Sequence, residues 1–313
     1  MIANYLVGII PIFLYILVLK SLDSFAVAKP SILAKSILCG LASCLVAFIL
    51  ARTIGWSADY ISPILEESLK ALFIIYLINR RRIRFLAEGL IYGAAIGGGF
   101  SILENTIYVL YCPTMDFGTA MFRGVGVAIM HMGCSGIMAC LLILTCQKMK
   151  MLNAVAMSIV PSIIIHLAHN IIDIEPSYRL FGTVILFLIL FYVIMTIGES
   201  LIYKWMDHSI SEDIYTLAAI RQGNFSATKS GQYLMHVKEQ FQPEVFFDMI
   251  CLVQLHLELK IEKQSRMLKA QAGFKDDRTE EELAAHNAQV AEIDHLFTQI
   301  GKTAKWVLRP LLR

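Results

Sequence analysis

One stretch of the sequence decides the fold, and it reads Trp56-Ser-Ala-Asp-Tyr-Ile-Ser-Pro-Ile-Leu-Glu-Glu-Ser-Leu-Lys-Ala-Leu-Phe-Ile-Ile-Tyr-Leu-Ile-Asn79. It is long and apolar enough to cross a lipid bilayer, yet Glu66, Glu67 and Lys70 stand near its middle. A charged side chain at the centre of a membrane helix costs about 2.5–3.5 kcal/mol on insertion scales. Ionisable residues in such a position therefore indicate a functional site with partners nearby.

The rest of the chain has the composition of a membrane protein. Only 17% of its 313 residues are charged and 57% are hydrophobic, whereas ordinary soluble domains are about 25% charged. The apolar residues gather in runs of about 20, which match the thickness of a bilayer core. We predict an all-α fold with a polytopic bundle of about seven spans. These spans are residues 2–19, 33–51, 56–79, 87–111, 118–145, 152–172 and 179–203.

Basic residues in alternate loops set the predicted orientation. Three loops are cytoplasmic by the positive-inside rule. They are the first loop, with Lys20, Lys29 and Lys35 at its edges, the loop Arg80-Arg81-Arg82-Ile83-Arg84, and the loop with Lys148 and Lys150. The N-terminus is then outside and the C-terminus cytoplasmic, in a multi-pass protein of the inner (plasma) membrane. A net charge of +2, spread over short loops and the C-terminal third, predicts no nucleic-acid partner.

The composition changes near Asp207, which predicts two domains. A membrane domain would cover residues 1–206, and a cytoplasmic helical domain of unknown role would cover residues 207–313. No catalytic constellation is visible in the second domain. We expect it to be a helical bundle or a self-association module, through which the protein could form a homo-oligomer.

Local signals predict the helices of this second domain. Ser-Glu-Asp at 211–213 is typical of a helix start, and Pro243 stands at a plausible first helical position of a long helix ending near Gly273. Thr279 and Glu282 have the spacing of a capping box at the start of another helix.

Further polar residues lie inside the other apolar spans. Glu104 and Asn105 lie deep in the fourth span, and Tyr108 follows on the face of Glu104. His131 lies in the fifth span. The sixth span contains His166 and Asn170, which share a helix face because they are four residues apart.

Small residues indicate how closely the fourth span packs. Gly93 and Gly97 form a small-xxx-small pattern beside Ala94 and Ala95. Such a smooth face allows the backbone of another membrane helix to approach. The glycines are therefore predicted to be packing residues rather than a nucleotide-binding loop.

The polar residues of the spans fall at a similar depth. At a rise of about 1.5 Å per residue, Glu67, Glu104, His131 and His166 lie roughly 18 to 24 Å from the cytoplasmic ends of their spans. Independent structural hydrogen bonds would have no reason to share a level. The pattern therefore predicts one polar chamber in the outer half of the membrane.

Carboxylates and imidazoles without a serine or cysteine nucleophile suit the activation of water. A carboxylate can take the proton while imidazole or amide donors stabilise an oxyanion. A zinc ion held by two histidines and a glutamate is the alternative for the same residues. We favour chemistry without a metal or other cofactor, because no His-Glu-x-x-His motif is present. A proton-coupled membrane carrier and a catalytically silent binder of membrane segments also remain open.

The same residues carry a resemblance to a known family. Glu66-Glu67-x-x-Lys70, Gly99-Phe100-x-x-x-Glu104-Asn105-x-x-Tyr108, His131 and His166-x-x-x-Asn170 resemble the motif set of the PrsW family. This is a bacterial family of glutamic-type intramembrane proteases, related to the CAAX prenyl proteases and the bacteriocin-processing membrane proteases. The resemblance covers about residues 56–175, in order and with the expected topology.

The resemblance implies hydrolysis of a peptide bond in a membrane-anchored protein, in the best-known case an anti-sigma factor. It implies that Glu66 is the leading base and that Glu67 and Glu104 support it. His131 would orient the water. His166 and Asn170 would hold the oxyanion. Lys70, Asn105 and Tyr108 would be supporting residues. From its spacing, Lys70 is predicted to be the charge partner of Glu66, four residues before it, or to extend toward the cytoplasmic surface. Arg123 lies near the outer end of its span and is an interfacial anchor or a site residue.

Overall fold

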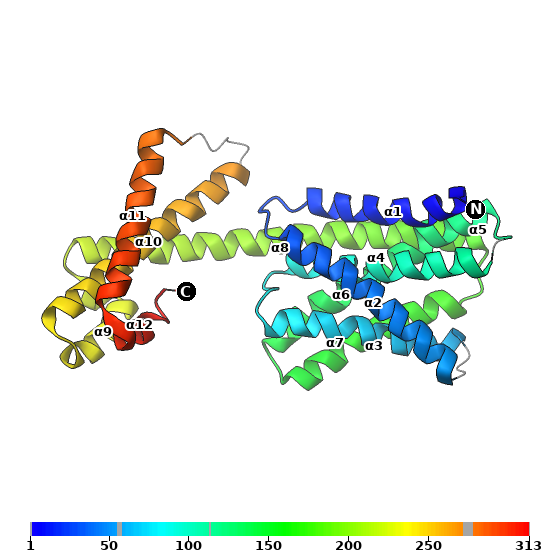
Figure 1. Cartoon of the computed structure of the whole chain (residues 1–313), viewed down its shortest axis with the longest axis horizontal. Coiled ribbons are helices and arrows are strands. Elements are labelled where there is room, and N and C mark those ends of the chain that lie inside the picture. Colours follow the sequence, from blue (N-terminus) through cyan, green and yellow to red (C-terminus); the bar gives the residue numbers. More distant parts are fainter. Residues whose placement is uncertain (1, 55–57, 113, 272–277, 313) are drawn as a thin grey trace. The chain divides into compact units, whose positions relative to one another are not determined.

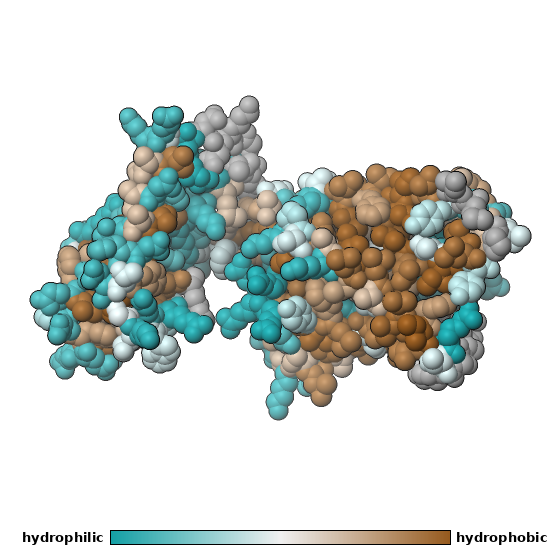
Figure 2. Space-filling model, in the orientation of Figure 1, coloured by the Kyte–Doolittle hydropathy of each residue, from teal (hydrophilic) through white to brown (hydrophobic). Residues whose placement is uncertain are grey.

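A computed structural model describes residues 2–54, 58–112, 114–271 and 278–312 of the chain. All regular elements among these residues are helices, as the sequence predicts. The chain divides into two compact units, Met1–Leu201 and Ile202–Arg313. Figure 2 shows apolar side chains over most of the visible face of the first unit, where the sequence predicts contact with lipid, and hydrophilic ones over the second.

The first unit is a bundle of long helices (Figure 1). Its elements in chain order are α1 (Ile2–Ser21), α2 (Pro30–Ile54), α3 (Ala58–Asn79), α4 (Leu86–Tyr111), α5 (Phe117–Met121), η1 (Phe122–Val127), α6 (Ala128–Cys146), α7 (Met151–Ile171) and α8 (Pro176–Arg221). α8 begins in this unit and ends in the next. η1 is a π-helical segment that joins α5 to α6, so these three elements form one near-continuous rod.

Six helical segments among the described residues are long and apolar enough to cross a membrane. They correspond to six of the predicted spans. The remaining predicted span is α3, which is not among the six because the charges of Glu66, Glu67 and Lys70 lower its hydropathy. The start of the predicted third span, Trp56, lies outside the described residues. Together with the apolar surface, these helices make the chain a multi-pass membrane protein.

α4 is the central helix of the bundle. It packs against α1, α2 and α6, and its side chains are buried without a break from Leu86 to Ser101. The predicted role of Gly93 and Gly97 in close packing is confirmed. A β-carbon on Gly97 would lie 2.2 Å from the backbone oxygen of His131, and one on Gly93 would lie 2.4 Å from that of Ser135. α4 and α6 therefore touch backbone to backbone beside the polar residues.

The second unit contains the end of α8 and a set of shorter helices. Its further elements are η2 (Phe225–Ala227), α9 (Lys229–Val237), η3 (Lys238–Gln240), α10 (Pro243–Gln271), α11 (Glu280–Gln299) and α12 (Gly301–Leu308). A core that includes Leu234, Met249, Leu252 and Leu308 holds them together.

The structure confirms some of the helix boundaries predicted for this unit and contradicts one. α10 begins at Pro243 as predicted, whereas its predicted end near Gly273 lies outside the described residues. The predicted capping box is confirmed, because Thr279 and Glu282 exchange hydrogen bonds at the start of α11. The predicted helix start at 211–213 is wrong. α8 runs through these residues to Arg221, since neither proline nor glycine interrupts it there.

Candidate active site

Side chains from α3, α4, η1, α6 and α7 converge inside the first unit. The central group consists of Glu66, Glu67, Lys70, Glu104, Arg123, His131 and His166. A cavity of about 410 Å³ lies beside them and is lined by α2, α3 and α4. Glu66 and Glu104 both face this cavity, so a peptide entering it would meet two carboxylates.

The deepest part of the site is an ion pair on α3. Lys70 Nζ lies 2.6 Å from Glu67 Oε1, and both side chains are fully buried. The sequence predicts a pair between Lys70 and Glu66, and this prediction is wrong, because the lysine turns to the residue three positions before it instead of four. The Lys70 ammonium also lies 4.3 Å from the centre of the Phe100 ring. The lysine is therefore held in place rather than extended toward the membrane surface.

The partners of His131 fix which of its nitrogens carries the proton. Lys70 Nζ lies 3.0 Å from His131 Nδ1, and an ammonium can only donate, so Nδ1 accepts. The proton of a neutral imidazole is then on Nε2, which lies 3.1 Å from Glu104 Oε2 and donates to it. His131 thus links the buried ion pair to the carboxylate on α4.

His166 is oriented in the same way by Glu67. Its Nδ1 lies 2.9 Å from Glu67 Oε1 and donates to that carboxylate, which leaves Nε2 with a free lone pair. Nε2 faces Glu66 Oε2 at 3.9 Å. This distance is too long for a direct hydrogen bond and suits a bridging water molecule.

Of the two adjacent glutamates on α3, Glu66 is the one that lines the cavity. The hydroxyl of Ser62 donates to its Oε1, whereas its Oε2 is buried and has no hydrogen-bond partner. A buried unsatisfied oxygen is costly unless something binds it. Glu66 Oε2 and His166 Nε2 are thus two acceptors that face the same gap.

Glu104 has a cationic partner, Arg123, for which the sequence predicts the position of an interfacial anchor or a site residue. Arg123, on the π-helical segment η1, lies 3.1 Å from Glu104 and directly over the ring of Tyr108, 3.4 Å from its centre. π-helical turns occur often at functional sites. The signal available in the sequence is the charge itself, since an arginine near the end of an apolar span requires a partner.

The remaining predicted residues lie at the edge of the site or outside it. Tyr108 lines the cavity and is half-exposed. Asn105 is buried, and its amide donates to the carbonyl of Gly8 on α1, so it holds two helices together. Asn170 is exposed at the end of α7 and contacts His169 instead of the cavity.

Three of these side chains are close enough together to be ligands of one metal ion. One ligand atom each from Glu66, His131 and His166 lies within 4.8 Å of the others, which is the spacing of a candidate site. However, both nitrogens of His131 already have partners, and one of these is the positive Lys70. Of the three residues, Glu66 and His166 have unoccupied ligand atoms, whereas His131 would have to release Lys70 or Glu104 before it could bind a zinc ion.

Comparison with known proteins places this arrangement in a family. The model of the PrsW family, described as intramembrane metalloproteases, matches residues 24–197, which is more than half of the chain. This range includes every polar residue of the site. No curated protein and no solved structure matches the chain significantly. The chain belongs to the PrsW family of intramembrane proteases, and it is therefore a peptide hydrolase of the membrane.

Proposed function

We propose that the chain is an endopeptidase that cleaves a membrane-anchored protein by means of a water molecule activated by Glu66. The observation that carries this proposal is the gap between Glu66 Oε2 and His166 Nε2. Two acceptors that share one water molecule can orient it, one of them taking its proton as it attacks. The water binds here beside the cavity that admits the peptide.

The proton and the new bonds are accounted for by residues of this chain. Glu66 takes a proton from the water, and the water oxygen forms a bond with the carbonyl carbon of the peptide. Collapse of the tetrahedral intermediate breaks the carbon–nitrogen bond, and Glu66 returns the proton to the departing amine. The products are a carboxylic acid, which retains the second proton of the water, and an amine, and the enzyme is unchanged.

The other residues of the site hold these groups in place. Glu67 fixes the ring of His166, and Lys70 balances the charge of Glu67 in the apolar interior. Tyr108 lines the cavity, and Arg123 lies over its ring and beside Glu104, so these two residues are the candidate donors to the oxyanion. The family resemblance gives that role to His166 and Asn170, and Asn170 would have to turn inward to perform it.

The test compares wild type with Glu66→Gln in cells, and membrane proteomics identifies a fragment that depends on activity. Loss of the base is expected to lower cleavage at least about 100-fold with unchanged protein level. Glu212→Gln, a largely exposed carboxylate on α8, is the matched control. Cleavage by Glu66→Gln at the wild-type rate would refute the role of Glu66.

The zinc version of the site is tested on purified protein. Without a metal, cleavage persists in a chelator and the protein contains substoichiometric zinc. Loss of activity in chelator, with recovery on addition of zinc, would replace the water-only mechanism by the metal one.

A further inference from the structure

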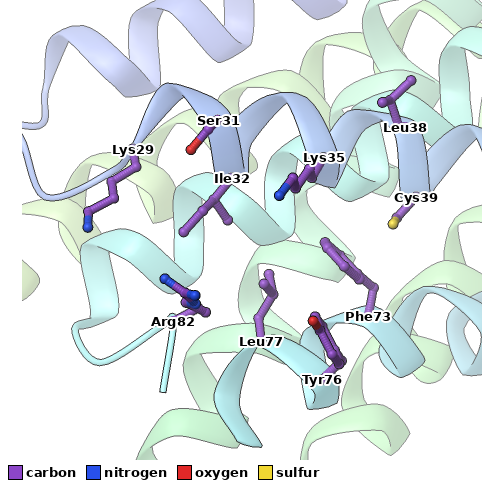
Figure 3. Close-up of a pocket in the computed structure, with 10 residues that line it drawn as sticks. All are labelled: Lys29, Ser31, Ile32, Lys35, Leu38, Cys39, Phe73, Tyr76, Leu77 and Arg82. Atoms are coloured by element: carbon purple, nitrogen blue, oxygen red, sulfur yellow. The ribbon is translucent and has the colours of Figure 1, made fainter. Parts of the chain in front are cut away.

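A second hollow lies toward the C-terminal end of α3, away from the cavity that Glu66 and Glu104 line. Its volume is about 720 Å³, and it lies between the first turns of α2 and the C-terminal end of α3 (Figure 3). Three cationic side chains, those of Lys29, Lys35 and Arg82, border it from two separate segments of the chain. These segments belong to the loops for which the sequence predicts a cytoplasmic position.

Local structure holds the backbone of these cations in place. The amide of Lys29 donates to the hydroxyl of the buried Tyr92 at 2.6 Å. The amide of Arg82 donates to the carbonyl of Leu77 at 2.8 Å, and Arg81 beside it has a positive φ of 52°. These features form the Schellman turn that ends α3. The cations therefore stand on fixed points of the bundle.

The positive charge of this hollow is not balanced by the protein. Within the described residues, Lys29, Lys35 and Arg82 form no ion pair, and the first turn of α2 contains no acidic residue. The nearby carboxylates are already engaged. Asp23 pairs with Lys20 and accepts two backbone amides, and Glu88 accepts two more. An anion is the ligand that this arrangement attracts.

An apolar groove continues from the hollow along α2 and α3. It has a volume of about 320 Å³, shares Cys39, Phe73 and Tyr76 with the hollow, and extends past Val46 and Leu72. The groove lies on helices that cross the membrane core. A free phosphate would use the cationic end alone, whereas a phospholipid would fill both parts.

We propose that this composite site binds one anionic phospholipid. Its headgroup phosphate contacts Lys29, Lys35 and Arg82, and one acyl chain lies in the groove between α2 and α3. A lipid in this position bridges the two helices that flank the catalytic cavity, and it binds whether or not the carboxylates are active.

The test is native mass spectrometry of the full-length protein in detergent, titrated with phosphatidylglycerol or phosphatidylcholine. Phosphatidylglycerol is expected to bind at least about 10-fold more tightly than phosphatidylcholine, an energy difference near 1.4 kcal/mol. The double variant Lys35→Gln/Arg82→Gln should lose this preference. The matched control Lys148→Gln/Lys150→Gln removes the same charge from another loop and should retain it. Equal loss in both variants would show that only overall charge attracts the lipid and would overturn the site.

A further variant separates a lipid from a free anion. Ala42 is exposed in the groove, so Ala42→Phe fills the space for the acyl chain without touching a charge. It should weaken phosphatidylglycerol binding several-fold at an unchanged melting temperature. Unchanged lipid binding by this variant, or full competition by inorganic phosphate at millimolar concentration, would contradict the proposal.

Discussion

Two lysine–carboxylate pairs of nearly the same length stand in opposite surroundings. Lys70 lies 2.6 Å from Glu67 with both side chains fully buried in the membrane unit. Lys260 lies 2.9 Å from Asp213 in the second unit, with 30% and 13% of these side chains exposed. The two distances are similar, but loss of one partner should cost more free energy of unfolding in the first pair. Water can solvate the remaining charge only in the second pair.

The buried pair belongs to the candidate active site. The buried pair continues through His131 and His166 to the two carboxylates at the cavity. The partly exposed pair joins α8 to α10 within the second unit. Burial of charged side chains inside the apolar unit is costly, and a catalytic role is the reason that we infer for their presence.

The largest effect is expected when the buried pair loses its cation. Lys70→Met leaves Glu67 buried without a positive partner, which should destabilise the membrane unit by about 3–5 kcal/mol. Lys260→Met should change stability by no more than about 1 kcal/mol. Thermal unfolding in detergent measures both. Similar shifts in the two variants would mean that water reaches Lys70, contrary to its burial.

Removal of Arg123 should act mainly on catalysis. Arg123→Gln deprives Glu104 of its cation and removes a candidate donor to the oxyanion, so kcat should fall on the order of 100-fold. Arg221→Gln removes a similar but exposed contact with Glu258 and should leave cleavage unchanged. A merely structural role of Arg123 would lower the melting temperature and leave kcat per folded molecule intact. Measurement of both quantities distinguishes these results.

A packing change offers a finer test of the same site. Gly97→Ala places a β-carbon against the backbone of His131, which should cost about 1–3 kcal/mol and draw His131 away from Glu104. Gly182→Ala on α8 meets no atom within 4 Å and serves as the control. We expect reduced cleavage and a lower melting temperature only for Gly97→Ala. Equal behaviour of the two variants would show that α4 and α6 tolerate separation.

The sequence predicts the buried charges well because each of them violates the hydropathy of its span. Glu66, Glu104 and His131 are visible for this reason, as is the close packing at Gly97. The partner of Lys70 was not predictable, since residues three and four positions apart are both neighbours on a helix. The exposure of Asn170 depends on where α7 ends and on how α7 is rotated about its own axis in the bundle. The periodicity of residues within one helix determines neither of these.

The π-helical turn at Arg123 escaped prediction for a related reason. One extra residue in a turn changes the direction of the following side chains without a change in composition. The continuation of α8 past residues 211–213 is a similar case, because serine and acidic residues are compatible with a helix interior as well as with its start.

The smallest expected effect concerns pH and the second unit. Partial burial, and then the neighbouring Lys260, lower the pKa of His256, while Asp213 opposes this shift. A group whose pKa is lower in the folded state binds more protons when unfolded, so stability should decline as pH falls below about 6.5. His256→Gln should flatten this decline in thermal unfolding measured between about pH 7.5 and 5. An equally steep decline in His256→Gln and in wild type would contradict the role of this histidine.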